Sequence, residues 1–350
     1  MKSKKRILIA PLNWGIGHAT RCIPIIENLT KNNFEVLIAT SGRPLQLLQE
    51  EFPHIESVEF KDYSINYSNY LPMSINILIQ IPKLFLAIKK EHKVLNKIIK
   101  SQKIDGVISD NRYGLYTKKV PCIFVTHQLQ IKSPILQTII QKINYKFISK
   151  FKECWIIDDE SNNLAGSLSK PKYIPKKSKY IGILSRFKKL KILKKYKLIA
   201  IVSGPEPQRT IFEKKLIEVM QKSKEKMLIV LGKPESYETK KINNLTIKSF
   251  LNSNELNIAI QSSELIISRS GYSTIMDLQK LEKKAVFVPT PGQTEQEFLA
   301  NYLKEKKICY SMNQNDIDLE QLFKKSEDYS GFSNSKKSDN IKWEDLFSLF

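Results

Sequence analysis

Short apolar runs alternate with longer segments of helical spacing along the chain. Residues 6–10, 35–39 and 106–109 are short runs rich in Ile, Leu and Val. Such runs are typical of strands that are buried on both faces of a parallel sheet. Residues 19–29 and 272–281 repeat apolar side chains three or four positions apart, as one face of a helix does. The alternation predicts an α/β fold built from doubly wound sheets. Further strands are predicted at residues 55–60, 122–125, 153–157, 197–203, 227–231, 265–268, 285–288 and 309–312.

A connector without periodicity divides this alternation into two halves. Residues 167–180 are rich in Lys, Pro and Ser, which is typical of a boundary between domains. We therefore expect an N-terminal Rossmann-like domain at residues 1–180, a C-terminal one at residues 181–330 and a tail at residues 331–350.

The tail contains one further periodic segment. Polar residues 326–339 are expected to be mobile. They precede an apolar pattern with the spacing of one helix face, formed by Trp343, Leu346, Phe347 and Phe350. This pattern predicts a terminal amphipathic helix.

Composition is consistent with two globular domains of a basic protein. The chain has 350 residues, 41% of them hydrophobic, and a formal net charge of +22. Such a charge admits an anionic membrane or nucleic acid as partner. No zinc knuckle or aromatic-basic RNA-binding run accompanies it, so a nucleic acid is not expected. The four cysteines are scattered, and no apolar run reaches the length of a membrane span, so we expect a cytoplasmic protein without a zinc site.

The stretch from 262 to 300 carries the clearest chemistry. Arg269, Ser270 and Gly271 interrupt the pattern between a strand and a helix. A glycine turn before a helix leaves backbone N–H groups and the positive end of the helix dipole free to bind a phosphate. Asp277, two turns into the helix, would accept hydrogen bonds from a ribose diol. An ordinary βαβ unit with solvated loops is the alternative. The next loop offers side chains for sugar hydroxyls, namely Gln293, Glu295 and Gln296.

This stretch resembles the donor-binding signature of family 28 glycosyltransferases. The resemblance lies in RSGYSTIMD at residues 269–277 and AVFVPTPGQTEQEFLAN at residues 285–301. The family includes the transferase that completes the lipid-linked peptidoglycan precursor and the monogalactosyldiacylglycerol synthases. It implies the GT-B fold, with two Rossmann-like domains facing across a cleft and the last helix crossing back to the N-terminal domain.

The resemblance also assigns residues outside this stretch. Arg186 matches an arginine that contacts the donor phosphates, and the loop with Gly204 and Arg209 matches the first phosphate loop of the second domain. Two prolines in that loop depart from the family pattern and remove N–H donors. Phe250 would flank the uracil and the backbone of Leu251 would read its edge, although in isolation both would be taken for core residues.

The glycine loop at residues 11–18 matches the family's N-terminal loop, which places Gly17 and His18 at the cleft. A near-neutral imidazole suits a general base that deprotonates an acceptor hydroxyl. Asp110 ends the strand at residues 106–109 and would orient His18. Alternatively, His18 donates a hydrogen bond on the phosphate side and Asp110 caps a turn. Residues expected to contact the acceptor, or to make loop hydrogen bonds only, are Arg21, Asn111, Arg112, His127 and Gln128.

Residues 74–103 are the least ordinary segment. An apolar run at residues 75–88 is followed by six lysines, Lys89, Lys90, Lys93, Lys97, Lys100 and Lys103. This pattern suits an interfacial helix on an anionic membrane, peripheral on the inner face of the plasma membrane. The alternative is a buried crossover helix with one solvated face.

Together these features predict an inverting glycosyltransferase that moves a hexosyl group from a UDP-sugar to an acceptor hydroxyl on a lipid or cell-envelope glycan. No metal or other cofactor is expected, because no Asp-x-Asp pair of the kind found in metal-dependent glycosyltransferases occurs and cationic groups are available for the diphosphate. Two alternatives remain open: a UDP-sugar 2-epimerase of the same architecture, and a non-catalytic basic protein that binds lipid or nucleic acid.

Overall fold

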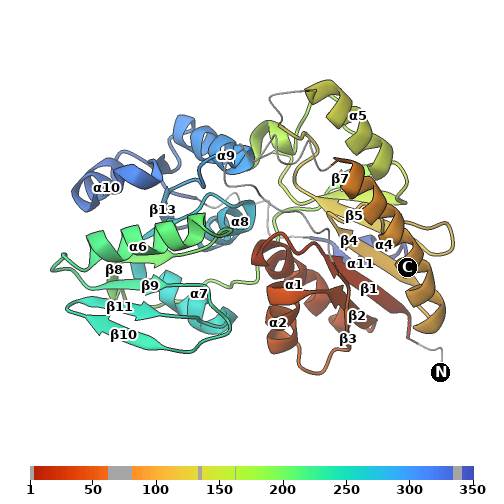
Figure 1. Cartoon of the computed structure of the whole chain (residues 1–350), viewed down its shortest axis with the longest axis horizontal. Helices are drawn as coiled ribbons and strands as arrows, with labels where there is room; N and C mark the ends of the chain where they lie inside the picture. Colours follow the sequence, from red (N-terminus) through yellow and green to blue (C-terminus); the bar gives the residue numbers. More distant parts are fainter. Residues whose placement is uncertain (1–3, 62–80, 133–135, 162, 334–340) are drawn as a thin grey trace. The chain divides into compact units, whose positions relative to one another are not determined.

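The computed structural model describes residues 4–61, 81–132, 136–161, 163–333 and 341–350. The chain forms two compact units (Figure 1). The first comprises Met1–Leu184 and Lys336–Phe350, and the second comprises Ser185–Ser335. Each is an α/β unit around a largely parallel sheet, as the alternation of apolar runs predicts.

The sheet of the first unit has the order β3-β2-β1-β4-β5-β6-β7, and all its described pairings are parallel. Its strands are β1 (Arg6–Pro11), β2 (Glu35–Thr40), β3 (Ser57–Glu59), β4 (Gly106–Asp110), β5 (Cys122–Thr126), β6 (Glu153–Ile156) and β7 (Ser178–Tyr180). Its helices are α1 (Ile16–Lys31), α2 (Gly42–Glu51), α4 (Ile81–Ser101), α5 (Gln137–Ile148) and α11 (Trp343–Phe347). Strand order reverses between β1 and β4, where Pro11 pairs with Asp110, and ligands bind at such switch points in open α/β sheets.

The sheet of the second unit has the order β10-β11-β9-β8-β12-β13-β14. Its strands are β8 (Tyr196–Ile201), β9 (Met227–Val230), β10 (Thr239–Ile242), β11 (Leu245–Lys248), β12 (Ser263–Ser268), β13 (Lys284–Phe287) and β14 (Tyr310–Ser311). Its helices are α6 (Gln208–Met220), α7 (Ser253–Gln261), α8 (Tyr272–Leu281), α9 (Thr294–Glu305) and α10 (Leu319–Ser326). β10 runs antiparallel to β11 in an edge hairpin, and strand order reverses between β8 and β12.

The terminal helix α11 packs within the first unit, as the amphipathic pattern and the resemblance predict. The ring of Phe347 lies 5.7 Å from that of Phe34 and 6.5 Å from that of Trp155. Phe350 fills the space beside Gly106, where a Cβ atom would come within 2.3 Å of its ring. Gly106 is therefore required because a larger residue would displace the end of the chain.

Two expectations about local structure are wrong. The connector predicted at residues 167–180 contains β7, which extends the first sheet by pairing with β6. Its sequence, Ser-Lys-Tyr, has no apolar alternation that would reveal a strand. The segment at residues 326–339 was expected to be mobile, but its first part is packed, because Tyr329 and Phe332 are buried and the Phe332 N–H donates to the Lys283 carbonyl. Residues 334–339 of that segment lie outside the described residues.

The predicted interfacial segment is described from Ile81 onward, as α4, and its apolar residues 75–80 lie outside the described residues. One side of α4 is buried through Ile88, Leu95 and Ile99. Among the described residues, no helix is both long and apolar enough to cross a membrane.

Candidate active site

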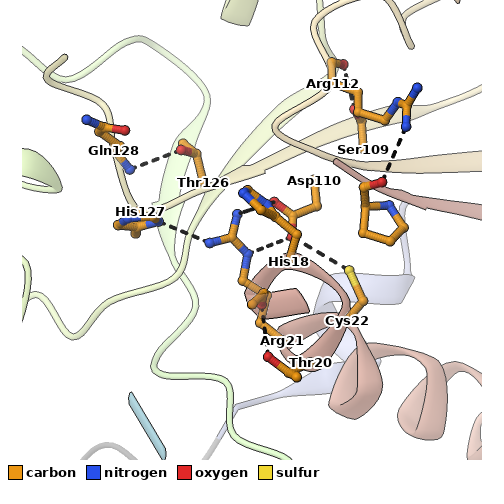
Figure 2. A network of polar contacts seen from close by, with 12 residues as sticks. His18, Thr20, Arg21, Cys22, Ser109, Asp110, Arg112, Thr126, His127 and Gln128 are labelled. Carbon is orange, nitrogen blue, oxygen red and sulfur yellow. Dashed lines mark hydrogen bonds and ion pairs between the residues drawn. The ribbon is translucent and has the colours of Figure 1, made fainter. Parts of the chain in front are cut away.

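Side chains predicted for catalysis meet at the carboxyl edge of the first sheet (Figure 2). Asp110 ends β4, and His127 follows β5 directly. His18 lies in the first turn of α1, which begins at Ile16 and not at residue 19 as expected. Gly15 makes the earlier start possible, since its φ of 116° is readily reached only by glycine. Gly17 and His18 therefore belong to the helix, and the expected glycine loop ends before them.

Arg21 joins these side chains into one network. Its Nε donates to Asp110 Oδ2 over 2.6 Å, and its Nη2 donates to Asp110 Oδ1. Nη2 also lies 2.8 Å from His18 Nδ1, and Nη1 lies 3.2 Å from His127 Nδ1. His18 Nδ1 is in turn 3.1 Å from Asp110 Oδ1. Asp110 thus contacts His18 as predicted, but its bidentate partner is Arg21, which is only 3% exposed and does not present its guanidinium to an acceptor.

Burial and charge fix the protonation states in this network. Burial alone would raise the pKa of Asp110, but the charge of Arg21 and the hydrogen bonds from Arg21 and His18 outweigh it and hold that pKa well below its usual range. Burial lowers the pKa of His18, Arg21 lowers it further, and Asp110 offsets only part of this effect. At neutral pH the site therefore contains a carboxylate, a guanidinium and a neutral His18 imidazole, whose side chain is 16% exposed.

The other residues expected near this edge take structural positions. Arg112 is fully buried, where its Nε donates to Glu91 of α4 over 2.8 Å and its Nη2 donates to the Lys61 carbonyl. Asn111 turns the chain with a φ of 56°, and its N–H donates to the Val125 carbonyl. The Gln128 N–H donates to Thr126 Oγ1 over 3.0 Å.

Two glycines lie in loops at the carboxyl edge of the second sheet. Gly204 follows β8 with a φ of 114°. Gly271 is the N-cap of α8, and no atom lies within 4 Å of the position that a Cβ would take. The Ser270 hydroxyl donates to the Gln296 carbonyl and ties this turn to α9. The N-terminus of α8 therefore begins at an uncrowded glycine turn, where the helix dipole would stabilise an anion.

Asp277 lies next to residues that precede the second sheet. Its Oδ1 accepts a hydrogen bond from the Ser185 hydroxyl over 2.5 Å. Burial raises its pKa to about 6, although the nearby charge of Arg186 and the Ser185 hydroxyl both act to lower it. Arg186 Nη1 also donates to Ser253 Oγ over 2.8 Å. Ser185 and Ser253 were not predicted. Ser185 had a signal, since it directly precedes Arg186.

Three side chains that were predicted to contact the donor are buried inside the second unit. Arg209 is buried and pairs with Glu206 and Glu213 at 3.1 Å each, so its charge is already compensated. Arg269 is 1% exposed and donates to backbone carbonyls. Gln296 is buried, and its Oε1 accepts from the Thr290 N–H over 2.9 Å. These side chains shape the loops rather than line an open surface.

The remaining predicted residues lie at loop and helix ends. Gln293 is the N-cap residue of α9, and Glu295 lies in its first turn. The ring of Phe250 meets that of Tyr237 edge to face with centroids 5.8 Å apart, whereas Leu251 is buried.

Sequence comparisons relate both halves of the chain to glycosyltransferases. Residues 197–344 match the glycosyltransferase family 28 C-terminal domain, and residues 5–152 match glycosyl transferase family 1. The chain is 23% identical to the UDP-N-acetylglucosamine–N-acetylmuramyl-(pentapeptide) pyrophosphoryl-undecaprenol N-acetylglucosamine transferase of Sulfurihydrogenibium sp. (strain YO3AOP1), over 95% of this chain and 96% of that protein.

Solved glycosyltransferases share the fold. SnogD from Streptomyces nogalater superposes with a TM-score of 0.65 at 13% identity, covering 99% of this chain and all of that one. MurG of Acinetobacter baumannii gives a TM-score of 0.52 at 14% identity, over 99% of this chain and 93% of that one. The predicted GT-B fold and the resemblance to family 28 are thus confirmed.

Proposed function

We propose that this glycosyltransferase, whose C-terminal unit belongs to family 28, moves a hexosyl group from a UDP-sugar to an acceptor hydroxyl with inversion. The arrangement around α8 carries the proposal. An open glycine turn at the start of the helix is followed by a half-buried carboxylate, Asp277. The first element suits a diphosphate and the second suits a ribose diol, so together they suit a nucleoside diphosphate.

Negative charge develops on the diphosphate as UDP leaves, and cations or dipoles must stabilise it. Arg186 is half-buried beside Asp277, and the N-terminus of α8 supplies a fixed dipole. Charge-stabilising groups held in place before the reaction lower the barrier most effectively. We propose that these groups act without a metal ion. EDTA should then leave the transfer rate unchanged, whereas restoration of activity by added Mg²⁺ or Mn²⁺ would contradict this.

In this proposal the first unit supplies the general base that deprotonates the acceptor hydroxyl. His18 is a neutral imidazole at the carboxyl edge of the sheet, and its Nδ1 lies within reach of the Asp110 carboxylate. When Nδ1 carries the proton and donates it to Asp110, Nε2 is free to take the proton of the attacking hydroxyl.

A lipid-borne acceptor is the chemistry we favour. The relative from Sulfurihydrogenibium is named for an undecaprenol-linked acceptor. In this chain, Phe85 and Leu86 of α4 are 37% and 67% exposed. Exposed lysines follow on the same helix, among them Lys89, Lys90 and Lys93. Exposed apolar side chains beside cations suit reversible contact with an anionic membrane.

The decisive experiment measures UDP release. Purified protein is first screened against UDP- and GDP-sugars by thermal shift, since a ligand that binds only the folded state raises its stability. The stabilising sugar nucleotide is then incubated with and without lipid-linked and soluble glycan acceptors. Transfer predicts UDP release that requires the acceptor and a product of inverted anomeric configuration. Release without an acceptor, together with an epimerised sugar, would identify a 2-epimerase instead.

A further inference from the structure

Two histidines approach one guanidinium in the first unit. Arg21 Nη2 is 2.8 Å from His18 Nδ1, and Arg21 Nη1 is 3.2 Å from His127 Nδ1 (Figure 2). A guanidinium can only donate hydrogen bonds and stays protonated at all relevant pH values. Each Nδ1 that contacts it must therefore accept, and an accepting Nδ1 carries no proton.

This contact restricts both imidazoles. An imidazolium has a proton on each ring nitrogen and cannot accept a hydrogen bond. A neutral imidazole that accepts at Nδ1 carries its proton at Nε2. Each imidazole can thus make its contact with Arg21 only as a neutral ring in the Nε2–H tautomer.

Asp110 competes with Arg21 for His18. The Asp110 carboxylate only accepts, so it requires a proton on His18 Nδ1, whereas Arg21 requires that none be there. The two contacts, at 3.1 Å and 2.8 Å, cannot be made at the same time. Only the contact with Asp110 leaves Nε2 unprotonated and able to act as a base.

We propose that Arg21 is a positioning residue that holds His18 and His127 as neutral imidazoles and sets the fraction of His18 in the tautomer that can act as a base. Its part in turnover rests on the proposed transfer reaction. In that reaction the acceptor hydroxyl proton moves to His18 Nε2 and the acceptor oxygen bonds to the anomeric carbon. The bond from that carbon to the UDP oxygen breaks, and UDP leaves with the electron pair.

Burial makes this arrangement effective. Arg21 and His127 are 3% and 4% exposed, and Asp110 is fully buried. Among the described residues, the charged or titratable groups that act on His18 are Arg21 from its own helix, Asp110 at the end of β4 and His127 after β5. Arg21 lowers the pKa of His18, and Asp110 raises it. Loss of Arg21 would therefore favour both the Nδ1–H tautomer and the imidazolium.

Nitrogen NMR of ¹⁵N-histidine-labelled protein tests the proposal without any substrate, so its outcome is independent of the proposed function. The chain has four histidines, and His54 and His92 serve as internal controls. In the wild type we expect His18 and His127 to show an unprotonated Nδ1 and a protonated Nε2. In Arg21→Met, His18 should shift to the Nδ1–H form and its pKa should rise by roughly one unit or more, because the cation is lost and Asp110 is released.

A second variant separates the charge of Arg21 from its geometry. Arg21→Lys keeps the cation but lacks the planar fork that reaches two nitrogens. We expect its tautomers to change while the pKa of His18 stays low. The proposal is overturned if wild-type His18 carries its proton on Nδ1, or if Arg21→Lys keeps both wild-type tautomers. The second criterion holds even if Arg21→Met does not fold.

Kinetics then test the role of Arg21 in transfer. In Arg21→Met the acid limb of the kcat profile should move to higher pH with the pKa of His18, while KM for the sugar nucleotide stays unchanged. A shift of the His18 pKa that leaves the acid limb in place would refute the role in turnover.

Discussion

We predict that the carboxylate of Asp277 strengthens UDP binding and lowers the stability of the folded protein at neutral pH. Its carboxylate accepts a hydrogen bond from the Ser185 hydroxyl, and burial raises its pKa to about 6. Replacing Asp277 with Ala removes the acceptor proposed for the ribose diol. A hydrogen bond to a charged group is worth roughly 1.5–3 kcal/mol, so UDP affinity should fall roughly 10- to 150-fold.

The pH dependence follows from the same pKa. At pH 8 almost all of Asp277 is ionised, whereas at pH 5 only about one tenth is, given a pKa of about 6. If the ionised form binds the diol, wild-type affinity should drop about tenfold across this range as pH falls. Asp277→Asn keeps the shape of the side chain but does not titrate, so it should lack this component. The terminal phosphate of UDP itself titrates near pH 6, and comparison of the two proteins at each pH cancels its contribution.

The stability of the folded protein should fall as pH rises, whereas its UDP affinity should rise. A carboxyl whose pKa is raised in the folded state binds more protons there than in the unfolded state, so its contribution to stability declines as pH rises from about 4 to about 6. Asp277→Asn should therefore unfold at a higher temperature than the wild type at pH 7.5 and bind UDP more weakly. Calorimetric titration and thermal unfolding measure the two effects. Unchanged UDP affinity in both variants would refute the assignment of α8 to donor binding.

Three further predictions concern other sites. His18→Ala should lower turnover roughly 10²–10⁴-fold and leave UDP affinity intact in titrations, and turnover near the wild-type rate would exclude His18 as the base. Replacing Lys89, Lys90 and Lys93 with Gln should weaken binding to anionic vesicles in sedimentation assays, and wild-type binding should fall steeply with salt; salt-insensitive binding would contradict the interfacial role. Its charge-matched control replaces three exposed lysines of the second unit, Lys241, Lys324 and Lys325. The ammonium of Lys283 shares the Gln261 and Ser263 carbonyls with Lys194, and burial and then Lys194 lower its pKa to about 7. The folded state thus binds fewer protons than the unfolded state above pH 7, so denaturant unfolding should show stability that rises between pH 7 and 10, and Lys283→Met should flatten this rise.

Regular elements and their order could be predicted because buried strands and amphipathic helices leave patterns of fixed period. The helix at 272–281 is observed with the predicted bounds. β7 and the β10–β11 hairpin were missed. β7 is short and polar, and β10 is exposed along its whole length, so neither needs an apolar pattern. The early start of α1 depends on the backbone angle of Gly15, which the sequence allows but does not require.

The sequence allowed these site residues to be assigned to the correct edge of the sheet, but it did not predict their side-chain contacts. Strand order brings His18, Asp110 and His127 together, and a residue after each strand is expected at that edge. Nothing in the sequence indicates that Arg21 reaches His127, since 106 positions separate them. Arg209 illustrates the same limit, because the glutamates that neutralise it lie three and four positions away and would equally suit a solvated helix face.

Arg269, which the resemblance assigns to donor contact, lies beneath the surface of the second unit. Its guanidinium donates to the carbonyls of Val288, Pro289 and Gln208 and to Gln314 Oε1, and no carboxylate lies among these partners. Burial lowers its pKa to about 10, so it remains a cation at neutral pH. Its guanidinium also lies over the Phe212 ring, 4.1 Å from the centroid. A buried cation compensated by dipoles and a ring, without a carboxylate among these partners, has a weakly screened field. The position that a Cβ would take at Gly204 lies 4.0 Å from its Nε. We therefore expect the field of Arg269 to reach the β8 loop and, together with the α8 dipole, to favour an anion at this edge without direct contact.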